Sequence, residues 1–345
     1  MAARAGVSVA TVSRVLSGKA ATGVPSYDRV MEAVKELDYV INGHARALGG
    51  NGPGSVAILV PHLGEPFFGL IAQGAQEQAA AEGRLCLVCS TGGDTERELA
   101  AVSLMREVGA EAVLLIGGVV ETEDYRRRMV SFARGLDAVG SRLVLVGRPV
   151  MEENLPVTVV EYDNHGGSHA ITSYLLSKGH QRILHLAGNP HNSAAKLRVQ
   201  GYRQALADYR IPYDEGLVRW GRDYTRAEGA EVMRAALKDG VRFSAVYGGN
   251  DNVAAGALTE LRSAGLRVPE DVSLAGYDDT TVAVDLQPRL TTVNLPHEEL
   301  GRTAVRLALH RGGAARERQH VTLGTHVVVR DSVRPWVPAD AESRS

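Results

Sequence analysis

From residue 55 onward, short and nearly continuous apolar runs alternate with longer amphipathic stretches. Such runs are typical of parallel strands buried on both faces, and the stretches between them have helical spacing. The alternation predicts an α/β fold of doubly wound parallel sheets, and the length of this region favours two lobes with a ligand cleft at the carboxyl ends of the strands. Strands are expected at 56–61, 85–90, 112–116, 143–146, 157–161, 183–186, 217–220, 245–247 and 272–275, and helices at 67–81, 95–108, 167–178, 196–209, 227–238 and 252–263.

The N-terminal segment follows a different pattern, that of a small all-α domain. Gly6 predicts a tight turn and Ser8 an N-cap. An apolar stripe at helical spacing follows, formed by Val9, Val12, Val15 and Leu16, while Ala10, Thr11, Ser13 and Arg14 lie on the other faces. Together with a third helix over 30–37 that starts near Pro25, this order predicts a helix-turn-helix. Its second helix either enters the DNA major groove or is part of an ordinary surface hairpin.

A flexible joint follows the helical segment. The stretch 44–48 is too short to be a stable helix in water, and it ends in the glycine-rich run 49–54. The segment is short, has helix-forming composition, and contains Arg46 and an exposed Leu48. We expect such a segment to fold into a helix only when it binds a partner.

Composition places the chain among ordinary globular proteins. Its 345 residues are 44% hydrophobic and 23% charged, with a net charge of −2, and no apolar run has the length that spans a bilayer. We therefore expect no membrane partner and a cytoplasmic location. Cys86 and Cys89 are expected to be two small core residues on a buried strand rather than a redox or zinc pair. Residues 1–50 carry six Lys or Arg against four Asp or Glu, a weak basic bias.

The motifs of several enzyme classes are missing from the sequence. No tight GxGxxG or GxxxxGK[ST] loop is present, which disfavours a nucleotide cofactor, and neither a GxSxG elbow nor an HExxH helix occurs. The eleven His residues are scattered without convincing ligand spacing. We expect no cofactor and no metal, and the chain is not expected to be an enzyme.

Aromatic and charged side chains follow several expected strands and therefore fall near the predicted cleft. Phe67 and Phe68 either stack on a sugar or base or pack in the core. Arg198 and Asp251 either hold vicinal hydroxyls from opposite sides with charge-assisted hydrogen bonds or form a structural ion pair between the lobes. Asp278 is a further strand-end carboxylate with the same two interpretations.

Three polar side chains complete the candidate cleft. Asn192 and Ser193 precede the helix that carries Arg198, and Tyr224 follows the strand 217–220. Asp163 and Asn164, at the start of the first helix of the second lobe, either cap that helix or line the cleft, and capping is favoured.

The order of these segments closely resembles the LacI/GalR family of bacterial transcription regulators, from about residue 3 to 335. The matching segments are 6–16 (GVSVATVSRVL), the third helix, the ARAL joint, 65–68, 178–183, 198–202, 268–274, 276–279 and 290–293. The resemblance implies a helix-turn-helix headpiece over 1–42, a hinge over 43–54 and a periplasmic-binding-protein-like, two-lobed effector and dimerisation domain over 55–335. Within that domain the N-lobe is 55–161 with 292–320 and the C-lobe is 162–291 with 321–335, and a disordered tail over 336–345 follows.

The resemblance also implies roles for individual residues. The DNA-binding residues begin with Ser8. Bases are read by Val9 and Ala10, followed by Thr11, Ser13 and Arg14, while Leu48 wedges into the minor groove beside Arg46. The effector contacts are Phe67, Phe68, Asn192, Ser193, Arg198, Tyr224, Asp251 and Asp278. The family pattern also has more of a first helix before the turn than residues 2–5 supply, and a phosphate-contacting Arg that this sequence lacks at 22–27.

These observations favour a homodimeric repressor that binds a palindromic, CG-centred double-stranded operator and responds to a small sugar. Two alternatives are weighed against it. A free-standing sugar-binding protein shares the two-lobed body but has no use for residues 6–48. A sugar-acting enzyme in the same cleft needs paired carboxylates, a role for which only Asp251 and Asp278 are available.

Overall fold

The computed structural model describes residues 1–16, 20, 22–39, 54–150, 152, 154–310 and 319–336. The expected joint, with Arg46 and Leu48, lies outside these residues. The expected tail does too, except for Trp336. That residue is held in place, because its backbone N–H donates to the Lys178 carbonyl over 2.7 Å.

Three helices form the N-terminal unit: α1 (Ala2–Ala5), α2 (Val9–Leu16) and α3 (Pro25–Glu36). Gly6 ends α1 with a φ of 61°, a left-handed conformation that glycine adopts without strain. The helices enclose a small core of Ala5, Val12, Val15, Val30 and Ala33. The helix-turn-helix expected from the sequence is present in the structure.

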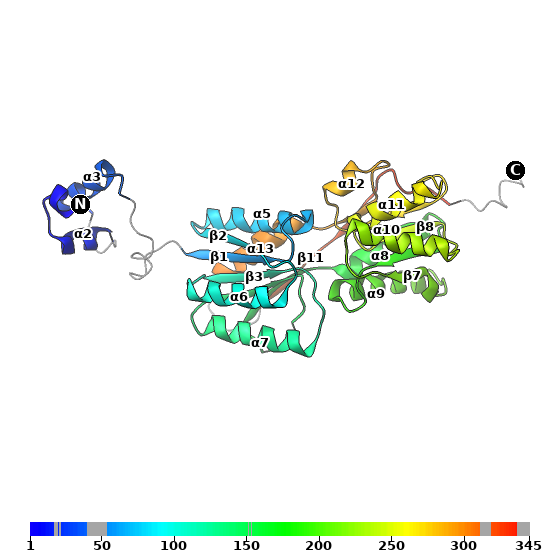
Figure 1. Ribbon diagram of the computed structural model, residues 1–345, viewed down its shortest axis with the longest axis horizontal. Helices are drawn as coiled ribbons and strands as arrows, with labels where there is room; N and C mark the ends of the chain where they lie inside the picture. The colour runs from blue at the N-terminus through cyan, green and yellow to red at the C-terminus, as the bar shows by residue number, and fades with distance from the viewer. Residues whose placement is uncertain are drawn as a thin grey trace, which may run out of the picture.

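A six-stranded parallel sheet organises the first lobe, in the order β11-β5-β4-β3-β1-β2. Helices α5 and α13 cover one face, and α6 and α7 cover the other (Figure 1). The elements are β1 (Ser55–Val60), α5 (Pro66–Ala81), β2 (Leu85–Ser90), α6 (Thr95–Glu107), β3 (Ala112–Ile116), α7 (Glu123–Asp137), β4 (Arg142–Val146), β5 (Val157–Tyr162), α13 (His297–Leu309) and β11 (Gln319–Leu323).

Strand β1 shows why the sequence folds this way. Its alternate side chains point to opposite faces of the sheet. Val56, Ile58 and Val60 pack toward α5 and α13, whereas Ala57 and Leu59 pack toward α6 and α7. Both faces are therefore buried, which explains the continuous apolar run.

The second lobe repeats the plan with a four-stranded parallel sheet in the order β7-β6-β8-β9. Helices α8 and α9 pack on one face, and α10 and α11 on the other. Its elements are α8 (Asn164–Ser177), β6 (Ile183–Ala187), α9 (Ser193–Asp208), the 3₁₀ turn η1 (Glu215–Leu217), β7 (Val218–Trp220), α10 (Arg226–Lys238), β8 (Ala245–Gly248), α11 (Asp251–Ser263), β9 (Ser273–Ala275) and α12 (Thr281–Asp285).

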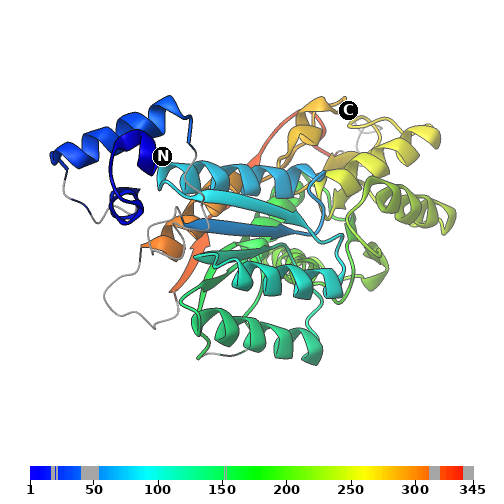
Figure 2. The ribbon, with the colours of Figure 1, turned by 60° about the vertical axis from the view of Figure 1, so that its left-hand side comes forward.

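The chain passes between the lobes after β5, before α13 and after β11, and Figure 2 shows the lobes side by side. Two short antiparallel strands, β10 (Thr292–Asn294) and β12 (His326–Val328), lie at this junction. The doubly wound, two-lobed α/β architecture expected from the sequence is confirmed. Helix α7, the turn η1 and the C-terminal elements α12, α13, β10, β11 and β12 were not among the expected elements.

Strand β2 departs from the sequence expectation. It lies at the edge of the sheet, where Leu85 is 60% and Val88 is 40% exposed. The expectation of a buried strand is therefore wrong. Cys86 and Cys89 are half-buried free thiols that pack against the cores on opposite faces of the sheet, which agrees with the expectation of two small residues packed in the core. The six residues of β2 were predicted to be a core strand because they are mostly apolar. Composition does not reveal that β2 is the last strand of the sheet, with no described strand paired to its outer edge.

Candidate functional site

A cavity of about 690 Å³ lies between the two lobes. It is lined by segments that follow the carboxyl ends of strands in both sheets, as expected for a doubly wound fold. From the first lobe come the segments after β1, β2, β3 and β4, and from the second lobe those after β6, β7, β8 and β9. Each of the predicted effector residues except Ser193 lines it.

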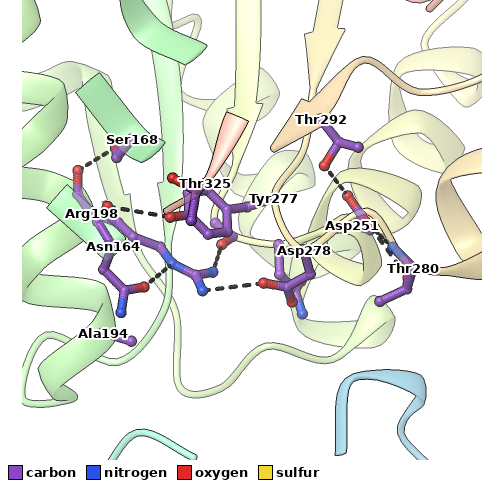
Figure 3. A network of polar contacts seen from close by, with 12 residues as sticks. Asn164, Ser168, Ala194, Arg198, Asp251, Tyr277, Asp278, Thr280, Thr292 and Thr325 are labelled. Atoms are coloured by element: carbon purple, nitrogen blue, oxygen red, sulfur yellow. Dashed lines mark hydrogen bonds and ion pairs between the residues drawn. The ribbon is translucent and has the colours of Figure 1, made fainter. Parts of the chain in front are cut away.

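Arg198 of α9 is the centre of the polar network in the second lobe (Figure 3). Its Nε donates to Asn164 Oδ1 over 2.9 Å, and its Nη2 donates to Asp278 Oδ1 over 3.2 Å. Its Nη1 donates to the Gly249 carbonyl. The Tyr277 ring lies 3.8 Å beneath the guanidinium, a cation–π contact. Only the planar guanidinium fork makes all of these contacts at once.

Asp278 is held in an unusual conformation opposite Arg198. Its φ is 102°, a region that residues other than glycine rarely adopt, and such strained residues cluster at ligand sites. Burial raises the pKa of Asp278 to about 6, and the Arg198 guanidinium opposes that rise. A buried pair of this kind offers both a donor and an acceptor to a hydroxylated ligand.

Asp251 has a different role from the one expected. One carboxylate oxygen accepts hydrogen bonds from the Thr280 backbone N–H over 2.8 Å and from its hydroxyl over 3.3 Å, and the other accepts from Thr292 Oγ1 over 2.6 Å. Burial, with the nearby Asp278 charge, raises the pKa of Asp251 to about 8. The alternative of an ion pair between Arg198 and Asp251 is wrong, because Arg198 pairs with Asp278, and all three residues belong to the second lobe. Binding of ligand hydroxyls by Arg198 and Asp251 stays a prediction.

Aromatic rings form the apolar walls of the cavity. Phe67 and Phe68 contact each other edge to face at 5.0 Å, and Phe67 also meets His297 at 5.4 Å. Both rings pack against the core and also line the cavity, so stacking on a sugar or base stays a prediction. The Tyr224 ring lies over Gly188, where a Cβ would approach it to 2.6 Å. Glycine is needed there to seat the ring.

Asn192 and Ser193 join the lobes instead of standing free in the cleft. The Asn192 side chain caps α9, accepting from the backbone N–H groups of Ala194 and Ala195. Ser193 Oγ accepts from the Val119 N–H over 3.2 Å, and the Ser193 N–H donates to the Val119 carbonyl over 2.9 Å. Of the two residues expected to cap α8, Asp163 does so, which confirms that part of the expectation, whereas Asn164 is the first residue of the helix and accepts from Arg198 instead.

Several charged residues at the cavity were not foreseen from the sequence. Arg148, after β4, pairs with Glu98 over 2.8 Å, with side-chain exposures of only 4% and 11%. Arg128 pairs with Asp124 on α7. All four residues line the cavity. Arg148 follows a strand end and was therefore discoverable by the rule that found Asp251, whereas the α7 pair required the helix itself to be recognised.

The exposed face of α2 presents the predicted DNA-reading residues. Val9 is 76% exposed, and Ala10, Ser13 and Arg14 are also exposed, while Thr11 is half-buried. Ser8 Oγ accepts from the Thr11 N–H over 3.1 Å and so caps the helix. Val9 therefore does not belong to the inward apolar stripe in which the sequence pattern placed it.

Relatives that extend over nearly the whole chain decide its classification. The HTH-type transcriptional regulator CelR of Thermobifida fusca is 36% identical, and the alignment covers 96% of each chain. The regulator DegA of Bacillus subtilis (strain 168) is 30% identical, with 97% of each chain covered.

The chain belongs to the LacI family. The model of bacterial regulatory proteins of the lacI family matches residues 1–42, and that of the periplasmic binding protein-like domain matches residues 172–333. This LacI-family chain is therefore a DNA-binding transcription regulator and not an enzyme.

Solved structures agree with this placement. The CelR–cellobiose complex is 34% identical, with a TM-score of 0.71 and coverage of 96% of this chain and 98% of that one. A lac repressor dimer bound to operator and an anti-inducer is 24% identical with a TM-score of 0.83, over 96% of this chain and 97% of that one, and it supports the fold. No helix in the described part of this regulator is both long and apolar enough to cross a membrane.

Proposed function

We propose that this regulator is a homodimeric repressor that binds a palindromic, CG-centred operator and is released from it by a neutral sugar bound between the lobes. The observation that carries the sugar assignment is the buried Arg198–Asp278 pair, seated on the Tyr277 ring and facing an aromatic-walled cavity. Sugars present hydroxyls to such donor–acceptor pairs and apolar ring faces to aromatic walls. Because a relative is solved as a CelR–cellobiose complex, cellobiose is the first sugar to test.

The DNA contacts belong to the exposed face of α2. Val9 and Ala10 present small apolar groups that suit a thymine methyl, and Arg14 reaches guanine or phosphate. Arg46 and Leu48 are proposed to act at the operator centre, Leu48 as a minor-groove wedge. A division into a headpiece over 1–42, a hinge over 43–54 and a two-lobed body over 55–335 accompanies this assignment.

Dimerisation is supported by the uncovered edge of the first lobe. Strand β2 has the sequence LCLVCS, with no charged residue, and exposes Leu85, Leu87 and Val88. Natural edge strands are usually protected by charges or proline, and exposed apolar patches mark interfaces. A second copy related by a twofold axis would cover this edge and place two headpieces on a twofold-symmetric site.

Effector control follows from the position of the cavity between the lobes. A ligand shifts the arrangement of the lobes only by its differential affinity for the two states. Coupling of ~1–3 kcal/mol is typical and corresponds to roughly 5- to 150-fold in operator affinity.

The deciding experiment is selection of genomic fragments by the purified full-length protein, followed by titration of the retained DNA with cellobiose and other sugars. We expect a palindrome with CG at its centre, and a sugar that lowers operator affinity by at least about fivefold. An operator half-site scrambled in sequence is the matched control. Retention of DNA with no shared motif, or an operator complex that no sugar alters, would contradict the proposal.

A further inference from the structure

The first-lobe end of the cavity carries its own cluster of charged side chains, separate from the Arg198 network. Arg148 pairs with Glu98 over 2.8 Å and donates to the Ile116 carbonyl over 3.3 Å. On α7, Arg128 pairs with Asp124. These elements, β4, α6 and α7, all belong to the first lobe, whereas Arg198 and Asp278 belong to the second.

Both arginines of this cluster retain unused hydrogen-bonding capacity. The Nε atoms of Arg148 and Arg128 are buried and have no partner among the described residues. A buried donor without an acceptor is unfavourable, and native structures usually provide one. Since these Nε atoms are shielded from the cavity, a ligand oxygen is expected to meet the outer guanidinium nitrogens of the two side chains, both of which line the cavity.

The charge of the cluster identifies the kind of ligand. Its two arginines are balanced by Glu98 and Asp124, as Arg198 is balanced by Asp278. A phosphate or carboxylate ligand requires arginines that are not already neutralised by acidic side chains. Hydroxyl groups, in contrast, both accept from a guanidinium and donate to a carboxylate.

The size of the cavity indicates how much of such a ligand it holds. Its volume of about 690 Å³ lies within the ~300–1,000 Å³ range of sites that enclose drug-sized molecules. A single pyranose ring is much smaller than a drug-sized molecule. A single ring bound at the Arg198 network would leave the first-lobe cluster without a ligand partner. A longer chain of rings fills the space and meets both clusters.

We propose that Arg148, Glu98, Arg128 and Asp124 form a second sugar subsite, so that the effector is a neutral glycan of at least two rings whose length these residues select. This inference rests on the proposed sugar response and specifies the ligand of the same cavity. It also gives α7 a function, because Arg128 is the residue through which that helix would read the second ring.

The test is calorimetric titration of the full-length protein with a panel of gluco- and galacto-disaccharides, their monosaccharides and glucose 6-phosphate. We expect one disaccharide to bind at least tenfold more tightly than its monosaccharide. Arg128→Gln should weaken that disaccharide about tenfold, or ~1.4 kcal/mol, and change the monosaccharide less than twofold. Arg127→Gln is the matched control, because Arg127 pairs with the same Asp124 but is 69% exposed and does not line the cavity.

Each outcome of the panel has a distinct meaning. A monosaccharide or glucose 6-phosphate that binds as tightly as any disaccharide overturns the second subsite and leaves the sugar response intact. Equal loss of both ligands in Arg128→Gln overturns the subsite too, because it indicates a general disturbance of the fold. If no sugar binds and none alters the operator complex, the proposed function fails and this inference fails with it.

Discussion

Asn252 Nδ2 donates a hydrogen bond to Glu65 Oε2 over 2.8 Å, and this bond joins the two lobes across the cavity. Glu65 is the residue before α5 in the first lobe, and Asn252 lies in the first turn of α11 in the second. The two hydrogen bonds between Ser193 and Val119 also connect the lobes. Both connections lie at the cavity. Such contacts exist only while the lobes are close together.

Removing this bond is expected to favour separated lobes. Glu65→Ala and Asn252→Ala should each weaken effector binding by roughly three- to tenfold, since a half-buried hydrogen bond to a charged group contributes about 1 kcal/mol after solvent screening. The double variant should be no weaker than either single one. Titration calorimetry on all four proteins measures this coupling. Additive losses would show that the two residues act independently.

Arg198→Lys is expected to weaken effector binding strongly while leaving operator binding without effector intact. Lysine retains the charge opposite Asp278 but cannot also reach Asn164 and Gly249 in the fixed geometry of the guanidinium. We expect a loss of effector affinity of about 100-fold, measured by calorimetry, with operator affinity followed by fluorescence anisotropy. Arg203→Lys, on the exposed face of the same helix, is the control. Parent-like sugar affinity in Arg198→Lys would remove Arg198 from the site.

Asp251 should make the fold more stable in acid than at neutral pH, relative to an uncharged variant. Its folded pKa of about 8 exceeds its ordinary value of 3.8, so the protonated form is favoured in the folded state. This contribution is present below pH 3.8 and is lost as the pH rises toward 8.

Asp251→Asn does not titrate, and its stability relative to the parent should therefore improve as the pH rises through that window. The slope is at most about 1.4 kcal/mol per pH unit. Urea unfolding of both proteins between pH 3.8 and 8 measures the difference between their free energies of unfolding. The contributions of the other titrating groups largely cancel in this difference, because both proteins contain them. A difference that stays constant with pH would show that the carboxyl group is already ionised in the fold.

The sequence predicted the regular parts of the fold closely, because strand and helix periods are imposed by burial on known faces. Helix α7 was missed although its buried residues, Tyr125, Met129, Phe132 and Leu136, recur at helical spacing. Consecutive arginines at 126–128 make this segment read as polar. Its apolar stripe is narrow because the helix covers only one face of the sheet. The helical period of the buried residues was present in the sequence, but the three arginines obscured it.

The cavity was located correctly, whereas the pairing within it was not. Strand ends indicate which loops converge, so Arg198, Asp251 and Asp278 were all found. Which carboxylate meets the guanidinium depends on loop conformation, and here the φ of 102° at Asp278 turns its side chain toward Arg198. No sequence pattern encodes that angle for a residue other than glycine.

Two valines of α2 should respond oppositely to truncation. Val9→Ala should lower operator affinity a few-fold without lowering stability, because its side chain is 76% exposed. Val12→Ala should destabilise the headpiece by about 1–2 kcal/mol, because Val12 is 8% exposed and lies in the headpiece core. Anisotropy on the selected operator and thermal unfolding separate the two effects. Unchanged operator affinity in Val9→Ala would remove Val9 from the DNA-reading surface.

A charge placed on the β2 edge should separate the dimer. Leu85 is 60% exposed, so Leu85→Glu leaves the folded chain intact but places a carboxylate in the proposed interface, next to its symmetry mate. We expect sedimentation velocity to show a monomer at micromolar concentration. Operator affinity should then fall on the order of 10²-fold or more, because one headpiece binds without the avidity of the second.

Sugar binding per chain should survive in Leu85→Glu, since Leu85 does not line the cavity. Val139→Glu is the matched control: Val139 is 58% exposed but follows α7 and leads into β4, which β3 and β1 separate from β2 in the sheet. A Leu85→Glu protein that remains dimeric and binds the operator with full affinity would place the interface on another face. A monomer that keeps full operator affinity would instead contradict the requirement for paired headpieces.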